Sequence, residues 1–107
     1  MINVNRVINI VIEQFNPKEI YLFGSYSQGT QTENSDLDML VVDERASLTN
    51  RAKDLTYEIS KALYPRDFHL DLLTYTPDNF NNKIKQNDPM VSQIVREGKK
   101  VYERARN

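Results

Sequence analysis

Two short apolar segments, Ile20–Phe23 and Met39–Val42, constrain the fold of this chain more than any other feature. Both have the length and composition of buried strands, and both are bounded by residues that favour turns. The first runs directly into Gly24-Ser25, and the second begins beside Asp36 and Asp38. The pattern therefore predicts a strand, a Gly-Ser turn, a short helix or loop, and a second strand with two carboxylates at its start.

The two carboxylates are separated by a single residue. Alternate residues of a strand point to the same face, so Asp36 and Asp38 are expected to project together, about 6.6 Å apart along the backbone. Carboxylates this close repel each other unless a cation lies between them. Mg²⁺ takes oxygen ligands and keeps positions open for water and phosphate, so it is the ion that we expect here.

The Gly-Ser turn forms the other half of a candidate phosphate site. Gly24 allows the backbone to turn tightly and to approach a ligand closely. Ser25 is expected to cap one or two helical turns over Tyr26–Gln31, whose first backbone N–H groups suit an anionic phosphate. A metal on one side and N–H donors on the other would hold the triphosphate of a nucleotide between them.

Each part of this pattern also has a simpler explanation. A Gly-Ser pair after a strand commonly forms only a turn, and an Asp-x-Asp pair is commonly a solvated strand end. Asp-x-Asp also occurs in nucleotide-sugar glycosyltransferases, although 107 residues is short for such a domain. The combination at this spacing, between two apolar strands, favours a joint site for phosphate and metal over these separate explanations.

The stretch of residues 24–38 resembles the signature of the DNA polymerase beta-like nucleotidyltransferase superfamily, which is Gly-Ser followed by an Asp-x-Asp pair. The short chain resembles the minimal branch of that superfamily, the MNT domains of prokaryotes, and Gly29 and Ser35 match this branch. Two positions depart from it. Ser27 stands where alanine is common, and Gln28 stands where a basic residue is common, which removes one expected phosphate contact.

The resemblance implies a third carboxylate on a later strand, and Asp71 in the strand-like segment Phe68–Tyr75 fits it. An acid within an apolar strand is costly to bury unless it has a partner or a metal, and the alternative is an edge-strand acid that faces water. His69 shares its face by alternation, but Mg²⁺ prefers oxygen, so His69 is given no catalytic role. The expected catalytic and metal-binding residues are Asp36, Asp38 and Asp71. Together they are expected to hold two Mg²⁺ ions about 3.5–4 Å apart.

The resemblance also implies the reaction, which is the transfer of AMP from ATP to a hydroxyl group. Larger relatives carry an added domain for the acceptor, whereas the elements expected here use nearly all residues, so the acceptor is small or arrives with a partner. Minimal members are often paired with a helical HEPN toxin and act as the antitoxin that places AMP on it. Two alternatives stay open, namely transfer to a small molecule such as an aminoglycoside, and a binding-only antitoxin that masks its partner without catalysis.

Composition is typical of a single domain, residues 1–107, with 39% hydrophobic and 27% charged residues. Lys and Arg number 14 against 15 Asp and Glu, and this near-neutral balance argues against dedicated DNA binding. The absence of cysteine excludes disulfides and thiolate metal sites. No apolar run approaches the roughly 20 residues of a membrane span, and residues 1–15 do not resemble a signal peptide, so we expect a cytoplasmic location.

Periodicity and turn residues along the rest of the chain predict an α/β fold, a small mixed β-sheet packed with helices. Four basic residues gather in the segment 99–106, and such a charge run is typical of a solvated end. The predicted elements are helices over residues 4–15, 48–63, 77–84 and 88–98 and strands over residues 19–23, 36–43 and 68–75.

Overall fold

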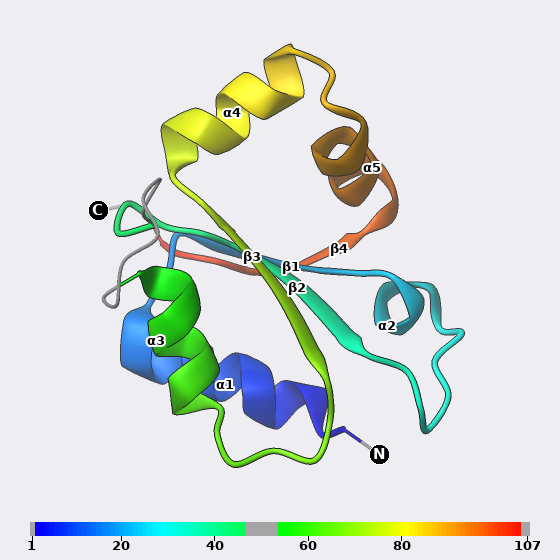
Figure 1. Cartoon of the computed structure of the whole chain (residues 1–107). Coiled ribbons are helices and arrows are strands. Elements are labelled where there is room, and N and C mark those ends of the chain that lie inside the picture. Colours follow the sequence, from blue (N-terminus) through cyan, green and yellow to red (C-terminus); the bar gives the residue numbers. More distant parts are fainter. Residues whose placement is uncertain (1, 47–53, 106–107) are drawn as a thin grey trace.

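The computed structural model describes residues 2–46 and 54–105, and a four-stranded sheet lies at its centre (Figure 1). The strands are β1 Glu19–Phe23, β2 Leu37–Val42, β3 Leu70–Tyr75 and β4 Lys99–Glu103. They are arranged in the order β3-β2-β1-β4. Strand β1 pairs antiparallel with β2 and β4, whereas β2 pairs in parallel with β3. The sheet is therefore mixed, as the sequence predicts.

Helices cover both faces of this sheet (Figure 1). They are α1 Val4–Phe15, α2 Ser25–Gln28, α3 Leu55–Ala62, α4 Pro77–Lys85 and α5 Pro89–Glu97. Helices α1 and α3 lie against one face, helices α4 and α5 lie against the other, and the single turn of α2 follows β1. No helix in the described part of the chain is long and apolar enough to cross a membrane.

Alternation along β2 divides its side chains between two hydrophobic cores. Leu37, Met39 and Val41 enter the core beneath α1 and α3, while Leu40 and Val42 enter the core beneath α4 and α5. Successive side chains of a strand point to opposite faces, so a continuously apolar strand is buried on both sides. The alternation of β2 therefore determines to which face of the sheet the side chains just before the strand point.

The boundaries of the first and last helices follow capping residues. The side chain of Asn3 accepts a first-turn N–H of α1 at 3.1 Å, and Asn16 ends the helix with a left-handed φ of 43°. Asp88 caps α5 in the same way, at 3.0 Å, directly before a proline. The predicted helices over residues 4–15 and 88–98 are therefore confirmed to within one residue at each end.

Other predicted elements are confirmed with smaller extents. The strand predicted over 36–43 is one residue shorter at each end, and the strand predicted over 68–75 begins two residues later. The helix predicted over 48–63 is described only from α3 onward. Leu48 and Ala52, on which the first part of that prediction rests, lie outside the described residues.

The charged segment near the end of the chain forms the fourth strand, which the sequence analysis did not predict, although its charged residues Lys99, Lys100 and Glu103 are exposed as expected. Strand β4 pairs with β1 at an edge of the sheet. Lys100 Nζ lies 2.9 Å from both Glu19 Oε2 and Glu103 Oε1, and these hydrogen bonds raise the pKa of Lys100 above its usual value. Edge strands readily carry charged side chains, and this charge concealed the strand in the composition of the segment.

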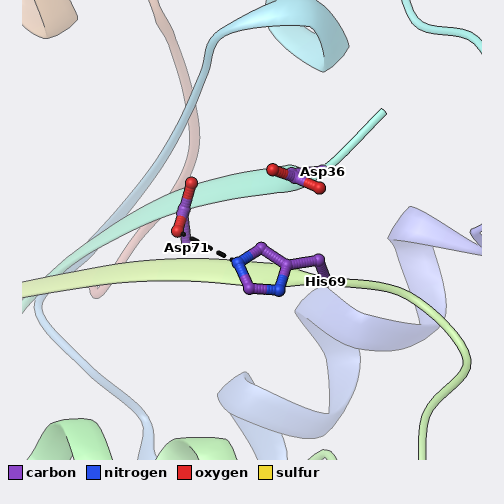
Figure 2. Close-up of side chains that lie close together, drawn as sticks. All are labelled: Asp36, His69 and Asp71. Atoms are coloured by element: carbon purple, nitrogen blue, oxygen red, sulfur yellow. Dashed lines mark ion pairs between the residues drawn. The ribbon is translucent and has the colours of Figure 1, made fainter. Parts of the chain in front are cut away.

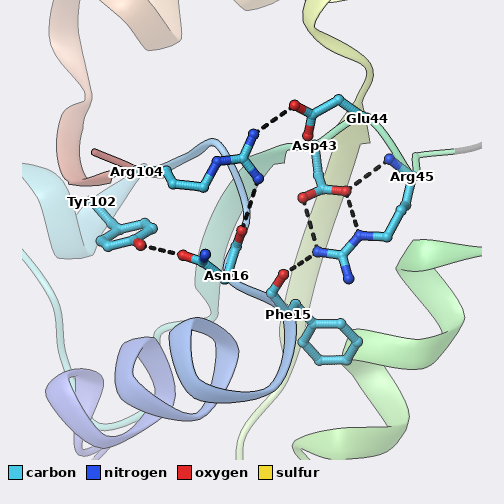
Figure 3. Close-up of polar contacts among 7 residues, drawn as sticks. All are labelled: Phe15, Asn16, Asp43, Glu44, Arg45, Tyr102 and Arg104. Atoms are coloured by element: carbon cyan, nitrogen blue, oxygen red, sulfur yellow. Dashed lines mark hydrogen bonds and ion pairs between the residues drawn. The ribbon is translucent and has the colours of Figure 1, made fainter. Parts of the chain in front are cut away.

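A buried carboxylate follows β2 at the end of the strand that lies away from Asp38 (Figure 3). Asp43 is fully buried, and Arg45 contacts both of its oxygens, from Nε at 2.7 Å and from Nη2 at 2.9 Å. Burial alone would raise the pKa of Asp43, but the hydrogen bonds from the side chain and backbone of Arg45 hold it below its usual value. Arg45 also donates to the carbonyl oxygen of Phe15, so one guanidinium joins the end of α1 to the end of β2.

Arg104 and Tyr102 connect the end of β4 to the same region (Figure 3). The guanidinium of Arg104 donates to the carbonyl oxygen of Asn16 at 3.1 Å and to Glu44 Oε2 at 2.5 Å. The hydroxyl of Tyr102 donates to the side-chain oxygen of Asn16. The left-handed turn after α1 is therefore held by groups from the opposite end of the chain.

Arg45→Ala should destabilise the protein by about 3 kcal/mol at neutral pH, because it leaves the buried carboxylate of Asp43 without its partner. Since the folded-state pKa of Asp43 is depressed, the contribution of the pair is present above the unfolded pKa and is lost as pH falls through the folded pKa. The difference in unfolding free energy from the parent should therefore shrink in acid. Urea unfolding at about pH 7 and at about pH 3 measures it.

Arg104→Ala is the matched control. Its acidic partner Glu44 is more than half exposed, so loss of that ion pair should cost no more than about 1 kcal/mol. Equal costs for the two arginine variants would contradict the importance assigned to the buried pair.

Candidate active site

Strand pairing brings the predicted carboxylates to one place. In the parallel pairing of β2 with β3, Asp38 lies directly opposite Asp71. Alternation points Asp38 to the same face as Leu40, which packs in the core beneath α4 and α5, and Asp36 follows the same alternation. The carboxylates therefore continue that face of the sheet beyond its apolar core, at the end where β2 and β3 begin.

Three polar side chains lie close together at this end of the sheet (Figure 2). Ligand atoms of Asp36, His69 and Asp71 are all within 4.8 Å of one another, and all three residues are exposed. His69 Nε2 is 3.6 Å from Asp71 Oδ1. Asp71 thus lies on an edge strand and faces solvent, as one of the two interpretations of the sequence states, but it also faces other ionisable groups.

Asp38 is the half-buried carboxylate of the site. Burial, a hydrogen bond with Asp71 and the negative charges of Asp71 and Asp36 together raise the pKa of Asp38 from 3.8 to about 6. Each of these effects disfavours the charged carboxylate, and a bound cation would oppose all of them. Carboxylate oxygens and an imidazole nitrogen are ligands of divalent cations, so this set of donors fits a metal of that kind.

Gly24 passes so close to Asp38 that no side chain fits there. A Cβ atom added to Gly24 would lie 2.1 Å from Asp38 Oδ2, well inside van der Waals contact. The backbone of Gly24 also has φ 72° and ψ −152°, a conformation that is essentially restricted to glycine. The tight turn predicted at Gly24 is confirmed, and its backbone closely approaches a carboxylate of the site, whereas its approach to a ligand stays a prediction.

Ser25 has a different position from the one predicted. Gly24 is the N-cap of α2, no side chain caps this helix, and Ser25 is its first residue. The hydroxyl that bonds to the turn belongs to Ser27, which donates to the carbonyl oxygen of Gly24 at 2.9 Å. The predicted capping role of Ser25 is therefore wrong, and the helix predicted after it is one turn that ends at Gly29.

A cavity of about 470 Å³ lies next to this turn, between α2 and α5. Gln28 closes part of its wall, because its side-chain nitrogen donates to the carbonyl oxygen of Glu97 at 2.7 Å. No local signal in the sequence predicts a contact between residues so far apart. The cavity is lined by Phe23, Gly24, Ser27, Gln28, Met90, Gln93, Ile94, Glu97 and Gly98.

A second, more polar hollow of about 320 Å³ borders part of the cluster. Asp36 and His69 both border it, together with the nearby acid Asp67. One hollow therefore lies next to the Gly-Ser turn, and another lies next to Asp36 and His69. Alternation already placed His69 on the face of Asp71 in the sequence analysis, but the preference of Mg²⁺ for oxygen ligands gave no reason to assign it a role.

Comparisons with known proteins find the same kind of domain by a family model and by a similar curated protein. The family model described as "Nucleotidyltransferase domain" matches residues 4–102. Protein adenylyltransferase MntA of Shewanella oneidensis (strain MR-1) is 32% identical over 103 residues, which are 94% of this chain and 66% of that protein. The chain thus spans slightly less than two thirds of the length of this curated relative.

Two solved structures share the fold at similar sequence identity. One is a chain in a toxin–antitoxin crystal structure with AMP-PNP, which is 30% identical, with a TM-score of 0.62 over 95% of this chain and 74% of that chain. The other is a chain in a mutant toxin–antitoxin MntA-HpeT complex in which two aspartates, two positions apart, are replaced by glutamate. It is 28% identical, with a TM-score of 0.61 over 95% of this chain and 74% of that one.

Gly24→Ala should destabilise the protein by about 2 kcal/mol or more, because the new methyl group meets the Asp38 carboxylate in a strained backbone conformation. Gly29→Ala is a matched control with a similar φ of 73°, where an added Cβ meets nothing within 4 Å, and it should cost only about 1 kcal/mol. Urea unfolding of both variants gives the comparison. Equal losses would show that the contact with Asp38 does not restrict this position.

Asp38→Asn should leave the metal-free protein as stable as the parent, or more so, at about pH 7.5. The folded-state pKa of about 6 lies above the ordinary 3.8, so the folded state binds this proton more tightly and loses stability as pH rises between these values. The asparagine variant lacks this loss. Unfolding free energies measured in EDTA across this pH range test it, and a variant that is clearly less stable than the parent above pH 6 would contradict it.

Proposed function

The chain belongs to the nucleotidyltransferase domain family, and we propose that it moves AMP from ATP onto a hydroxyl group of a partner protein. The observation that carries this proposal is the grouping of Asp36, Asp38 and Asp71 at the starts of β2 and β3, directly beside the glycine turn. Such a site presents acidic metal ligands next to a backbone that a phosphate can approach closely.

The similar proteins support both the nucleotide and the partner in this proposal. MntA is a protein adenylyltransferase by name, and the toxin–antitoxin structure contains AMP-PNP, an ATP analogue. The mutant complex pairs MntA with HpeT. We take the partner of this chain to be a toxin of the HEPN type, with this chain as the antitoxin.

In the proposed mechanism, Asp36, Asp38 and Asp71 would hold two divalent cations, for which Mg²⁺ is the ion expected from the sequence. Bound divalent ions supply neutralisation of phosphate charge and a lower pKa for the attacking hydroxyl. Asp38 binds a proton more tightly than an ordinary aspartate does, so below about pH 6 it would have to release this proton before it could hold a cation. The contribution of the protein is thus largely electrostatic, and it is concentrated in three carboxylates.

The turn at Gly24 and Ser25 holds the triphosphate in this proposal. The first N–H groups of a helix have no intrahelical acceptor, and those of α2 directly follow Gly24, whose backbone lies against the Asp38 carboxylate. The cavity between α2 and α5 receives the nucleoside, since its volume suits a small ligand and its lining is partly apolar. The hollow beside Asp36 and His69 leaves a path for the acceptor.

The chemical step is a displacement at the α-phosphorus. The acceptor oxygen forms a bond to this phosphorus while the bond to the leaving pyrophosphate breaks, and the hydroxyl proton passes to solvent. Protein groups mostly position the reactants and screen their charge, as in other phosphoryl transfers.

A binding-only antitoxin is the second candidate, and the position of Gln28 favours it. Minimal relatives commonly have a basic residue here, whereas the amide of Gln28 is bonded to the carbonyl oxygen of Glu97. A neutral side chain committed to the protein supplies no positive charge to a phosphate. In this case the chain masks its partner by contact alone.

With α-labelled ATP and Mg²⁺, the protein should transfer label to its partner. Asp36→Ala and Asp38→Ala should lower the rate at least about 100-fold, because each removes a proposed metal ligand, while binding of the partner persists. Asp78→Ala, which removes an exposed acid on α4, is the matched control and should retain the rate. Label counting, with a pull-down for binding, gives both readouts.

Three outcomes separate the candidates. Loss of transfer in the two site variants, with partner binding intact, supports the enzyme. Site variants that neutralise the partner as fully as the parent would indicate masking instead. Label that accumulates only on a small molecule such as an aminoglycoside would replace the protein acceptor with that molecule.

A further inference from the structure

His69 is the single histidine in the sequence, and it lies at the cluster of carboxylates. Its Nε2 atom is 3.6 Å from Asp71 Oδ1, and its ligand atom lies within 4.8 Å of those of both Asp36 and Asp71 (Figure 2). The ring is directed toward the carboxylates in this view. A nitrogen donor is therefore present in a site for which the sequence predicts only oxygen donors.

The backbone holds His69 in this position. The N–H of Leu37 donates to the carbonyl oxygen of His69 at 3.0 Å, which aligns the residue with the start of β2. On either side of it, Phe68 and Leu70 pack against the core beneath α1 and α3. Because neighbours in an extended segment point to opposite faces, these contacts direct the imidazole to the carboxylate face.

Pairing with Asp71 does not by itself explain the histidine. Both side chains are more than half exposed, at 69% and 59%, and exposed ion pairs contribute little to stability. Donor atoms around one octahedral ion are about 3–4.4 Å apart, so a group within 4.8 Å needs only small rotations to share a cation. The spacing thus fits joint coordination.

The type of donor atom determines which cation the site binds most tightly. Mg²⁺ prefers oxygen ligands, whereas imidazole suits transition ions such as Fe²⁺, Ni²⁺ and Zn²⁺. Mn²⁺ also takes oxygen ligands readily, but as a transition ion it binds a nitrogen donor more strongly than Mg²⁺ does. Resting on the metal-dependent function above, we propose that His69 is a nitrogen ligand of one of the two cations, at the position bordered by Asp36 and Asp71. This position selects Mn²⁺ or a similar transition ion over Mg²⁺.

Electron spin echo spectroscopy of the intact protein loaded with Mn²⁺ alone tests this assignment directly. Because the chain has one histidine, protein without a polyhistidine tag should show imidazole ¹⁴N modulation that can come only from His69. The modulation should disappear in His69→Asn. The side chain is exposed, so this variant should fold, and the measurement on the parent protein does not depend on it.

Calorimetric titration of each metal measures the selectivity. His69→Asn should weaken Mn²⁺ binding about 10-fold or more and change Mg²⁺ binding less than about 2-fold. Asp67→Asn is a matched control, because Asp67 borders the same hollow without belonging to the group of ligand atoms, and it should change neither.

Bound Mn²⁺ without nitrogen modulation would overturn the role of His69 and leave the proposed transferase intact. Equal weakening of both metals in His69→Asn would overturn the selectivity. A parent protein that binds neither ion, even with ATP present, would overturn both the metal-dependent function and this inference.

Discussion

The register of strand β2 is the constraint on which the rest of the structure depends. Its pairing with β3 places Asp38 opposite Asp71, and its pairing with β1 places Phe23 opposite Asp38, so that Gly24 follows immediately beside that carboxylate. A slip of one residue would turn each carboxylate toward the wrong face and each core residue toward the wrong helices. Two packed cores oppose such a slip, because Leu37 and Leu40 are both fully buried on opposite faces.

This arrangement separates groups that stabilise the fold from groups that cost stability. The end of β2 carries Asp43, whose buried charge is neutralised by Arg45 within the chain. The start of β2 carries Asp38, whose neighbours are two further acids and whose pKa is raised. Strand β2 is thus flanked by a carboxylate whose charge is neutralised by Arg45 at one end, and it carries Asp38, which has no cationic partner of this kind, near the other. Asp38 lies where a cation is proposed to bind.

The parts of the fold that the sequence predicts well are those governed by neighbouring residues. Apolar periodicity with an Asn or Asp cap defines α1 and α5, and alternation alone is enough to place Asp36 and Asp38 on one face. The identity of the third acid came from the family resemblance, since its partner across the sheet depends on a parallel pairing. Contacts between distant segments have no such signal, and the bond from Gln28 to Glu97 is the clearest example. Strand β4 was missed for another reason, because Lys and Glu side chains on an edge strand look like a solvated segment.

The antiparallel pairing of β4 with β1 has a consequence for the order of folding on the ribosome. Strands β1, β2 and β3 and the turn at Gly24 are all synthesised before α4 and α5, and β4 is synthesised after them. Every proposed cation ligand has therefore been synthesised while β1 still lacks its partner β4. At that stage the hydrogen bond from Gln28 in α2 to Glu97 at the end of α5 is also absent. During that interval β1 is an unpaired sheet edge, which invites association with neighbouring chains until residues 99–103 emerge and cover it.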